Sequence, residues 1–243
     1  MSAQRVLVLV PALNEQETVA EVVGAAHGLG YEVCVVDDGS TDDTAVRASA
    51  AGAHVVRLPV NLGIGGALRC GFRWALEHSF DTVVQVDADA QHDPGEIVLL
   101  LDAMRETGAE MVIGSRFAAG AGAYEVHRAR RLVMAILSRR VAKMTGLRVL
   151  DSSSGFRAIR RPLLDRFASD YPVEYLDSVE ALVDAGRTGA RIIERPVAMA
   201  PRLGGQPSAG TLSGVWHVVR VMIAMELMHR RRPRTPASLS GAD

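Results

Sequence analysis

The chain has 243 residues, of which 48% are hydrophobic and 23% charged, and its formal net charge of −1 gives no electrostatic reason to expect a nucleic-acid ligand. Its length suits one α/β domain with a single core. Two cysteines, Cys34 and Cys70, are too few for a disulfide framework, which fits a cytoplasmic protein. We expect no secretory signal, because the apolar run over 5–10 is too short for one. We expect no membrane span either, because the most hydrophobic stretch, over 215–228, is interrupted by His217, Arg220 and Glu226.

Apolar runs alternate with helical patterns through the first half of the chain. The patterns predict strands over 6–10, 32–36, 54–58, 82–86 and 110–113, and helices over 15–28, 41–52, 65–80 and 95–107. Asn14 is the expected N-cap of the first helix. Strands that are apolar throughout and alternate with helices predict an α/β fold: a single, mostly parallel sheet flanked by helices.

The second half has a less regular pattern. It predicts helices over 124–145, 162–168, 174–186 and 212–229, a strand over 191–196, a glycine- and proline-rich loop over 201–210, and a disordered tail over 230–243. We therefore expect a main domain over 1–211. The last helix has an apolar stripe and is followed by Arg230, Arg231 and Arg232. It suits an anionic membrane surface, the core or a homodimer contact, and these alternatives stay open.

Polar clusters follow the predicted strands of the first half, over 11–15, 37–40, 61–66, 87–93 and 114–117. In an open parallel sheet, ligands bind beyond the carboxyl ends of the strands. Because five clusters fall at such ends, we expect them to form one site.

Asp87, Ala88 and Asp89 follow the predicted strand over 82–86. In an extended strand end, residues two apart face the same side, so the two carboxylates would lie together with Gln91 next in phase. Such carboxylates repel unless a cation or a proton lies between them. Oxygen ligands of this kind suit Mg²⁺ or Mn²⁺, with substrate phosphates completing the shell. A solvated acidic turn is the alternative, and the strand end favours the metal site.

Three further features bear on ligand binding. One carboxylate of the Asp37–Asp38 pair could accept a hydrogen bond from a nucleobase N–H, although an Asx turn or a helix cap explains the pair as well. The glycine-rich stretch over 61–66 resembles a phosphate cradle but matches no nucleotide-binding fingerprint. Arg116 could hold an anion, and so could the basic cluster over 128–131, whose alternative is a solvated helical face.

Taken together, these clusters resemble the family 2 glycosyltransferases with the GT-A fold, and within them the dolichol/polyprenyl-phosphate mannosyl- and glucosyltransferase branch. The motifs that match, in the family's order, are VPALNE over 10–15, VVDDGSTD over 35–42, NLGIGGA over 61–67, DADAQHDP over 87–94, GSR over 114–116 and DSSSGFR over 151–157. The resemblance implies a catalytic domain over 1–211 and a GT-A fold.

The resemblance also implies roles for individual residues. Nucleotide-sugar binding falls to Pro11, Leu13, Asn14, Glu15, Val36, Asp38, Gly66, Asp87, Ala88 and Asp89. The metal, Mg²⁺ or Mn²⁺, falls to Asp87, Asp89 and Gln91. The acceptor phosphate falls to Arg116, Arg131, Arg202 and Ser208, and the catalytic set is Asp89, Asp151 and Arg116. Two positions depart from the family pattern: Leu13 stands where an aromatic often stacks on the base, and Ala209 stands where the acceptor loop has a Lys.

The function that the resemblance implies is inverting transfer of a hexosyl unit from a GDP-mannose- or UDP-glucose-type donor to a polyprenyl phosphate, by a cytoplasmic enzyme with peripheral contact to the inner face of the cell membrane. One alternative is transfer to a hydroxyl of a small molecule or glycan. That reaction needs a general base, for which Asp151 and the His92–Asp93 pair are candidates. A second alternative is a nucleotide-sugar binding protein without turnover, and no nucleic-acid partner is expected in any case.

Overall fold

The structure is a computed structural model that describes residues 5–118, 128–172 and 177–199, and of residues 128–135 and 177 only the backbone. The chain divides into two units, Met1–Ser208 and Ala209–Asp243, and the described residues all belong to the first. The first half contains β1 (Val6–Ala12), α1 (Val19–Gly28), β2 (Glu32–Asp37), α2 (Thr44–Ala50), β3 (His54–Arg57), α3 (Gly63–Glu77), β4 (Thr82–Gln85), η1 (Pro94–Glu96) and α4 (Ile97–Thr107). The second half contains β5 (Met111–Ser115), α5 (Arg128–Thr145), β6 (Arg157–Arg160), α6 (Leu163–Asp170), α7 (Asp177–Arg187) and β7 (Ile192–Pro196).

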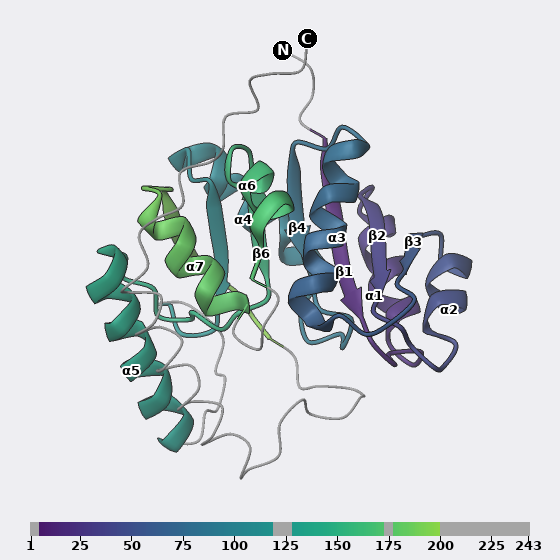
Figure 1. Cartoon of the computed structure of the whole chain (residues 1–243), viewed down its shortest axis with the longest axis horizontal. Helices are drawn as coiled ribbons and strands as arrows, with labels where there is room; N and C mark the ends of the chain where they lie inside the picture. The colour runs from purple at the N-terminus through teal and green to yellow at the C-terminus, as the bar shows by residue number, and fades with distance from the viewer. Residues whose placement is uncertain (1–4, 119–127, 173–176, 200–243) are drawn as a thin grey trace. The chain divides into compact units, whose positions relative to one another are not determined.

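Over the described residues, seven strands form one sheet in the order β3-β2-β1-β4-β6-β5-β7 (Figure 1). Strand β6 runs antiparallel to both of its neighbours, β4 and β5, and the other pairings are parallel. The predicted α/β fold with a mostly parallel sheet is therefore confirmed. The carboxyl ends of the parallel strands lie at the same edge, together with the amino end of β6, so this edge collects the polar loops.

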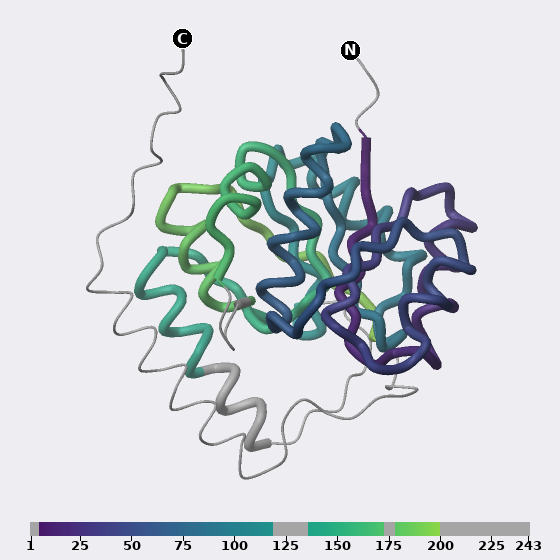
Figure 2. The backbone as a smooth tube through the Cα atoms, turned by 45° about the vertical axis from the view of Figure 1, so that its right-hand side comes forward, coloured from purple at the N-terminus to yellow at the C-terminus, as the bar shows by residue number. Residues whose placement is uncertain are grey.

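Helices cover both faces of the sheet. On one face, α1 packs on β2, and α4 packs on β5 and β6. There Val8, Val10 and Val33 join one buried apolar cluster with Val22 and Leu100. On the other face, α3 packs against α6, and both lie in front of the sheet in Figure 1. Gly71 lets α3 approach β1 closely, since a Cβ there would collide with the Leu9 side chain. The elements of the first half and those after β5 lie side by side along the sheet (Figure 2).

The predicted start and N-cap of the first helix are wrong, and one strand was not predicted. The first helix begins at Val19, not at residue 15, and its N-cap is Thr18. Asn14 has a left-handed backbone (φ 54°), and its side chain accepts a hydrogen bond from the Thr41 N–H instead of capping α1. Strand β6 was not predicted, because Arg157 and Arg160 interrupt the apolar pattern. Its first three residues are nevertheless buried between β4 and β5, and Arg160 is partly buried.

Several predictions fall outside the described residues: the loop over 201–210, the helix over 212–229, the tail over 230–243 and the domain boundary at 211. Within the ranges that the structure does describe, no helix is both long enough and apolar enough to span a bilayer.

Candidate active site

The loops after β1 and β2 form one side of the candidate site. The strands end in register at Ala12 and Asp37, and the Asp38 N–H donates to the Ala12 carbonyl (2.9 Å). Beyond that point the Asn14 N–H donates to Ser40 Oγ (2.9 Å) and the Glu15 N–H to Thr44 Oγ1 (2.9 Å). These bonds fix the two loops to each other. Asn14 and Glu15 therefore lie beside the loop that carries Asp38.

Asp38 is 4% exposed, and its Oδ1 accepts a hydrogen bond from the Leu62 N–H (2.7 Å). Burial raises the pKa of this carboxyl above its usual value, the N–H groups of Leu62 and Gly63 oppose that shift, and the charge of Asp37 adds to it. A buried carboxylate of this kind is ready to accept a ligand's N–H, which would restore part of the lost hydration.

The other residues predicted to bind the nucleotide differ in exposure. Pro11 and Val36 are buried strand residues, and Leu13 is 40% exposed. Gly66 lies in the first turn of α3, where a Cβ would approach Leu62 Cβ to 2.5 Å. Leu62 is the N-cap of α3, and its N–H donates to Asp38, so the amino end of α3 meets the Asp38 loop. A helix amino end offers N–H groups to an anion such as a diphosphate.

Asp87 and Asp89 lie just past the end of β4, and the prediction that they occupy an extended strand end is wrong. Residues 88–90 form a turn in which Ala90 has φ 58° and the Gln91 N–H donates to Asp89 Oδ1 (3.1 Å). Gln91 is therefore placed by an Asx turn and not by strand alternation. The Asp87 side chain is 32% exposed and Asp89 is 8% exposed, so the turn presents one carboxylate more openly than the other.

A buried histidine lies beside Asp87. The Asp87 N–H donates to His92 Nδ1 (3.4 Å), and the same Nδ1 is 3.8 Å from Asp87 Oδ2. His92 is 3% exposed and stacks on Phe156 with 5.1 Å between ring centroids. Asp93 is exposed and caps η1 by accepting from the Gly95 N–H (2.8 Å). The predicted His92–Asp93 pair is thus split between a buried ring and a surface cap.

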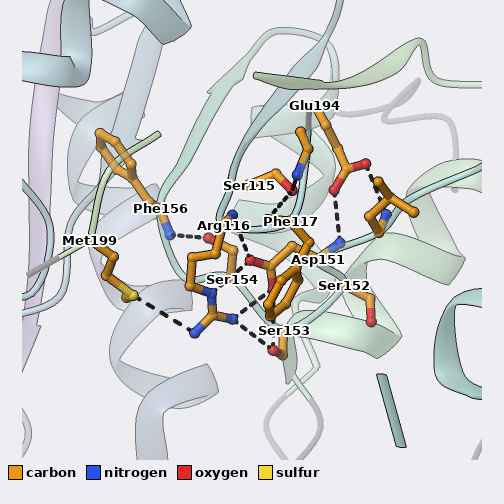
Figure 3. A network of polar contacts seen from close by, with 12 residues as sticks. Ser115, Arg116, Phe117, Asp151, Ser152, Ser153, Ser154, Phe156, Glu194 and Met199 are labelled. Atoms are coloured by element: carbon orange, nitrogen blue, oxygen red, sulfur yellow. Dashed lines mark hydrogen bonds and ion pairs between the residues drawn. The ribbon is translucent and has the colours of Figure 1, made fainter. Parts of the chain in front are cut away.

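Arg116, after β5, and Asp151, before β6, form a buried bidentate ion pair (Figure 3). Arg116 Nε donates to Asp151 Oδ2 (2.7 Å) and Nη2 to Asp151 Oδ1 (2.6 Å), and the Arg116 backbone N–H also donates to Oδ2 (3.0 Å). Arg116 is 9% exposed and Asp151 0%. Nη2 also donates to Ser153 Oγ (3.1 Å), and Nη1 contacts Met199 Sδ at 3.8 Å. Two of the three predicted catalytic residues, Arg116 and Asp151, are therefore paired with each other.

Two residues that were not predicted hold the loop around Asp151. The Glu194 carboxylate, on β7, accepts from the N–H groups of Leu150 and Asp151 at 2.8 Å each (Figure 3). The buried Arg157 guanidinium donates to the carbonyls of Ser152 (3.0 Å) and Ser154 (2.8 Å). No sequence signal singles out Glu194, because its strand also contains Arg195, whereas the match of residue 157 to a family motif marks Arg157.

The remaining predicted residues are only partly visible. Arg131 lies on α5 with only its backbone described, and Arg202 and Ser208 lie outside the described residues. In the described ranges, no three His, Cys, Asp or Glu side chains gather as a ready metal cage. Mg²⁺ is commonly held by one or two carboxylates plus substrate phosphates. Asp87 and Asp89 in one turn fit such a metal.

Comparisons with known proteins agree with this geometry. The model of the family described as "Glycosyl transferase family 2" matches residues 7–167. The chain belongs to glycosyl transferase family 2. Among relatives of this family 2 glycosyltransferase, the undecaprenyl-phosphate mannosyltransferase of Micrococcus luteus is 34% identical over 221 residues, covering 86% of this chain and 90% of the relative. The polyprenol monophosphomannose synthase of Mycolicibacterium smegmatis is 32% identical over 210 residues, covering 82% and 78%.

The family 2 glycosyltransferase also resembles solved structures with the GT-A fold. Glucosyl-3-phosphoglycerate synthase of Mycobacterium tuberculosis, in complex with Mn²⁺, UDP-glucose and phosphoglyceric acid, has a TM-score of 0.70 and 28% identity, covering 94% of this chain and 80% of that one. The same enzyme with Mg²⁺ and UDP has a TM-score of 0.67 and 28% identity, covering 98% and 82%. The predicted family, the GT-A fold and the transferase class are thus confirmed.

Proposed function

We propose that this glycosyltransferase moves one hexosyl unit, with inversion, from a nucleotide-diphosphate sugar of the GDP-mannose or UDP-glucose type to a polyprenyl phosphate, with Mg²⁺ or Mn²⁺ at Asp87 and Asp89. The observation that carries the proposal is that Asp38, the Asp87–Asp89 turn and the Arg116–Asp151 pair all lie in loops at one edge of the sheet. Two relatives named for polyprenol or undecaprenyl-phosphate mannosyl transfer support this acceptor.

On the donor side, Asp38 would accept an N–H of the nucleobase, and Pro11, Leu13, Asn14, Glu15 and Val36 would surround the nucleoside. Gly66 would let the diphosphate approach the amino end of α3. Asp87, Asp89 and Gln91 would hold the metal, which when bound neutralises the charge that grows on the leaving diphosphate. The two solved structures that hold UDP with Mn²⁺ or Mg²⁺ support a divalent metal.

On the acceptor side, Arg116, Arg131, Arg202 and Ser208 would position the phosphate. A phosphate is already an anion at neutral pH, so it needs positioning and not a base. Both oxygens of Asp151 accept from Arg116, so the carboxylate fixes the direction of the guanidinium. Because the acceptor is a lipid, the enzyme would meet it by peripheral contact with the membrane.

A second candidate is transfer to a hydroxyl of a small phosphorylated acid. The likeness to a synthase solved with phosphoglyceric acid favours it. That reaction needs a general base, and Asp151 could serve only after Arg116 had released one of its oxygens.

A crossed assay separates the two candidates. The purified chain with Mn²⁺ is given GDP-mannose or UDP-glucose, each with undecaprenyl phosphate in detergent micelles or with 3-phosphoglycerate, and products are separated by mass. We expect a glycosylated lipid phosphate with one of the donors. Transfer to 3-phosphoglycerate alone would contradict the lipid acceptor and support the second candidate.

The metal assignment is tested with Asp89→Ala under saturating Mn²⁺. Losing one of two carboxylate ligands should lower kcat/KM by at least about 100-fold, because the charge on the leaving diphosphate is no longer neutralised. Asp102→Ala removes a carboxylate on α4 that pairs with Arg105, and it serves as the matched control with unchanged turnover. Turnover like that of the wild type in Asp89→Ala would exclude the metal site.

A further inference from the structure

Gly155 lies directly against the carboxylate of Asp87. An ideal Cβ at position 155 would be 2.7 Å from each of the two carboxylate oxygens of Asp87 and 3.1 Å from its carbon. The backbone of Gly155 has no positive φ, so its conformation alone does not require glycine. The close approach does, because any side chain at 155 would occupy the space in which the Asp87 carboxylate now rests.

His92 fixes the backbone of Asp87 from another side. Its Nδ1 accepts the Asp87 N–H (3.4 Å), so in the neutral ring the proton lies on Nε2. Nε2 is buried and has no hydrogen-bond partner among the described residues. An unsatisfied buried N–H is unfavourable by about 1–3 kcal/mol. The sequence therefore retains a polar ring where an apolar one would pack better, which indicates a use for its Nδ1.

The stack of His92 on Phe156 joins the two supports. Phe156 is 0% exposed and follows Gly155 directly. The residue that stacks on the His92 ring is therefore the chain neighbour of the glycine that lies against the Asp87 carboxylate. A Cβ at Gly114 of β5 would lie 2.6 Å from Phe156 Cδ1, so the Phe156 ring has no room to move toward β5. Residues 155–156, which directly precede β6, thus support Asp87 together with His92.

We propose that Gly155 and His92 are positioning residues that together set the Asp87 carboxylate in the direction required for the divalent metal. The proposal deepens the proposed function and rests on its metal site. A Cβ at 155 meets only the far end of a short side chain, so the carboxylate moves and the fold is kept. Supports behind a metal ligand typically change metal affinity by about 10–100-fold when they are removed.

The test measures Mn²⁺ binding to the full chain in the presence of UDP or GDP, by titration calorimetry, for the wild type, Gly155→Ala, His92→Phe and His92→Asn. We expect at least about a 10-fold weaker Mn²⁺ affinity in Gly155→Ala and in His92→Phe, which keeps the ring but loses the acceptor. His92→Asn, whose amide oxygen can take the place of Nδ1, should recover part of the loss. Gly24→Ala is the matched control, since a Cβ there meets nothing within 4 Å.

The outcomes separate this inference from the proposed function. Wild type that binds no Mn²⁺ with either nucleotide overturns both. Wild type that binds Mn²⁺, together with Gly155→Ala that binds it equally well, overturns the inference and leaves the proposed metal site standing. Thermal melts without metal report whether each variant folds, and should Gly155→Ala unfold, an unchanged affinity in His92→Phe overturns the inference in the same way.

Discussion

The surroundings of Asp38 disfavour the ionised form of its carboxyl group. Its carboxyl is buried beside Asp37, and its pKa is raised mainly because burial penalises the ionised form. At neutral pH the ionised group therefore destabilises the native chain relative to a neutral side chain of the same shape. A charge that lowers stability is common where a ligand, and not the fold, requires it, which is consistent with the proposed role of Asp38 in donor binding.

Asp38→Asn should raise the free energy of unfolding at pH 7 and weaken donor binding. The Asn oxygen can still accept the Leu62 N–H, while the unfavourable buried charge is gone. Since the raised pKa makes the native state bind its proton more tightly, the stability difference from wild type should shrink as the pH falls through the pKa of Asp38. Urea unfolding over a pH series and nucleotide titration measure both effects. A variant less stable than wild type at pH 7 would contradict this account.

Only some residues of the candidate site could be predicted from the sequence. Asp38, Asp87, Asp89 and Arg116 follow apolar strands in the chain, so local pattern was enough to find them. The close approach of Gly155 to the Asp87 carboxylate joins residues that are far apart in the sequence, so no local sequence pattern predicts it. The Asx turn at Asp89 was missed because strand alternation was extended past the last residue of β4.

Among the elements, β6 shows what pattern alone does not find. The strand has four residues, two of them Arg, and its burial arises from pairing with β4 on one side and β5 on the other. The Arg157 guanidinium is satisfied by carbonyls of the preceding loop and by that of Ser178 on α7, at 2.9 Å. Longer strands such as β1 and β2 were predicted, because their own continuous apolar runs indicate that they are buried.

Strand β7 should stabilise the loop before β6 through Glu194, whose carboxylate accepts from two backbone N–H groups. Hydrogen bonds to a charged group are worth about 1.5–3 kcal/mol each, so Glu194→Ala should lower the free energy of unfolding by at least about 2 kcal/mol. Glu194→Gln keeps one oxygen acceptor and should lose less. Urea denaturation of the wild type, Glu194→Ala and Glu194→Gln measures the order of their free energies of unfolding. Equal stability of Glu194→Ala and wild type would show that the loop does not need this tether.

For the molecule as a whole, the two thiols report on the integrity of the core. Cys34 on β2 is fully buried, and burial raises the pKa of its thiol to about 12, whereas Cys70 on α3 is partly exposed. We expect one thiol to react with Ellman's reagent in the native protein at pH 8 and two in urea, with Cys70→Ser reacting only in urea. Rapid reaction of both thiols in the native state would contradict a closed core.

The raised pKa of Cys34 also predicts how the stability of the protein changes at alkaline pH. In the unfolded chain the Cys34 thiol ionises near its ordinary value of 9.0, and in the native chain only near about 12. Because the native state holds the proton more tightly, the stability that Cys34 contributes is complete below pH 9 and is lost as the pH rises toward the native pKa.

The antiparallel direction of β6 has a consequence for how such enzymes diverge. Ile113 of β5 and Arg157 of β6 are paired neighbours in the sheet, so the stretch between them leaves and re-enters the scaffold at adjacent points. That stretch carries Arg116 and Asp151, while the residues that we propose to bind the donor precede it. Under these proposed roles, one continuous segment can be exchanged to change the acceptor without altering the order of the strands. Such an exchange would have to keep the last two positions of the segment, Gly155 and Phe156. Gly155 lies against the Asp87 carboxylate, and Phe156 stacks on His92.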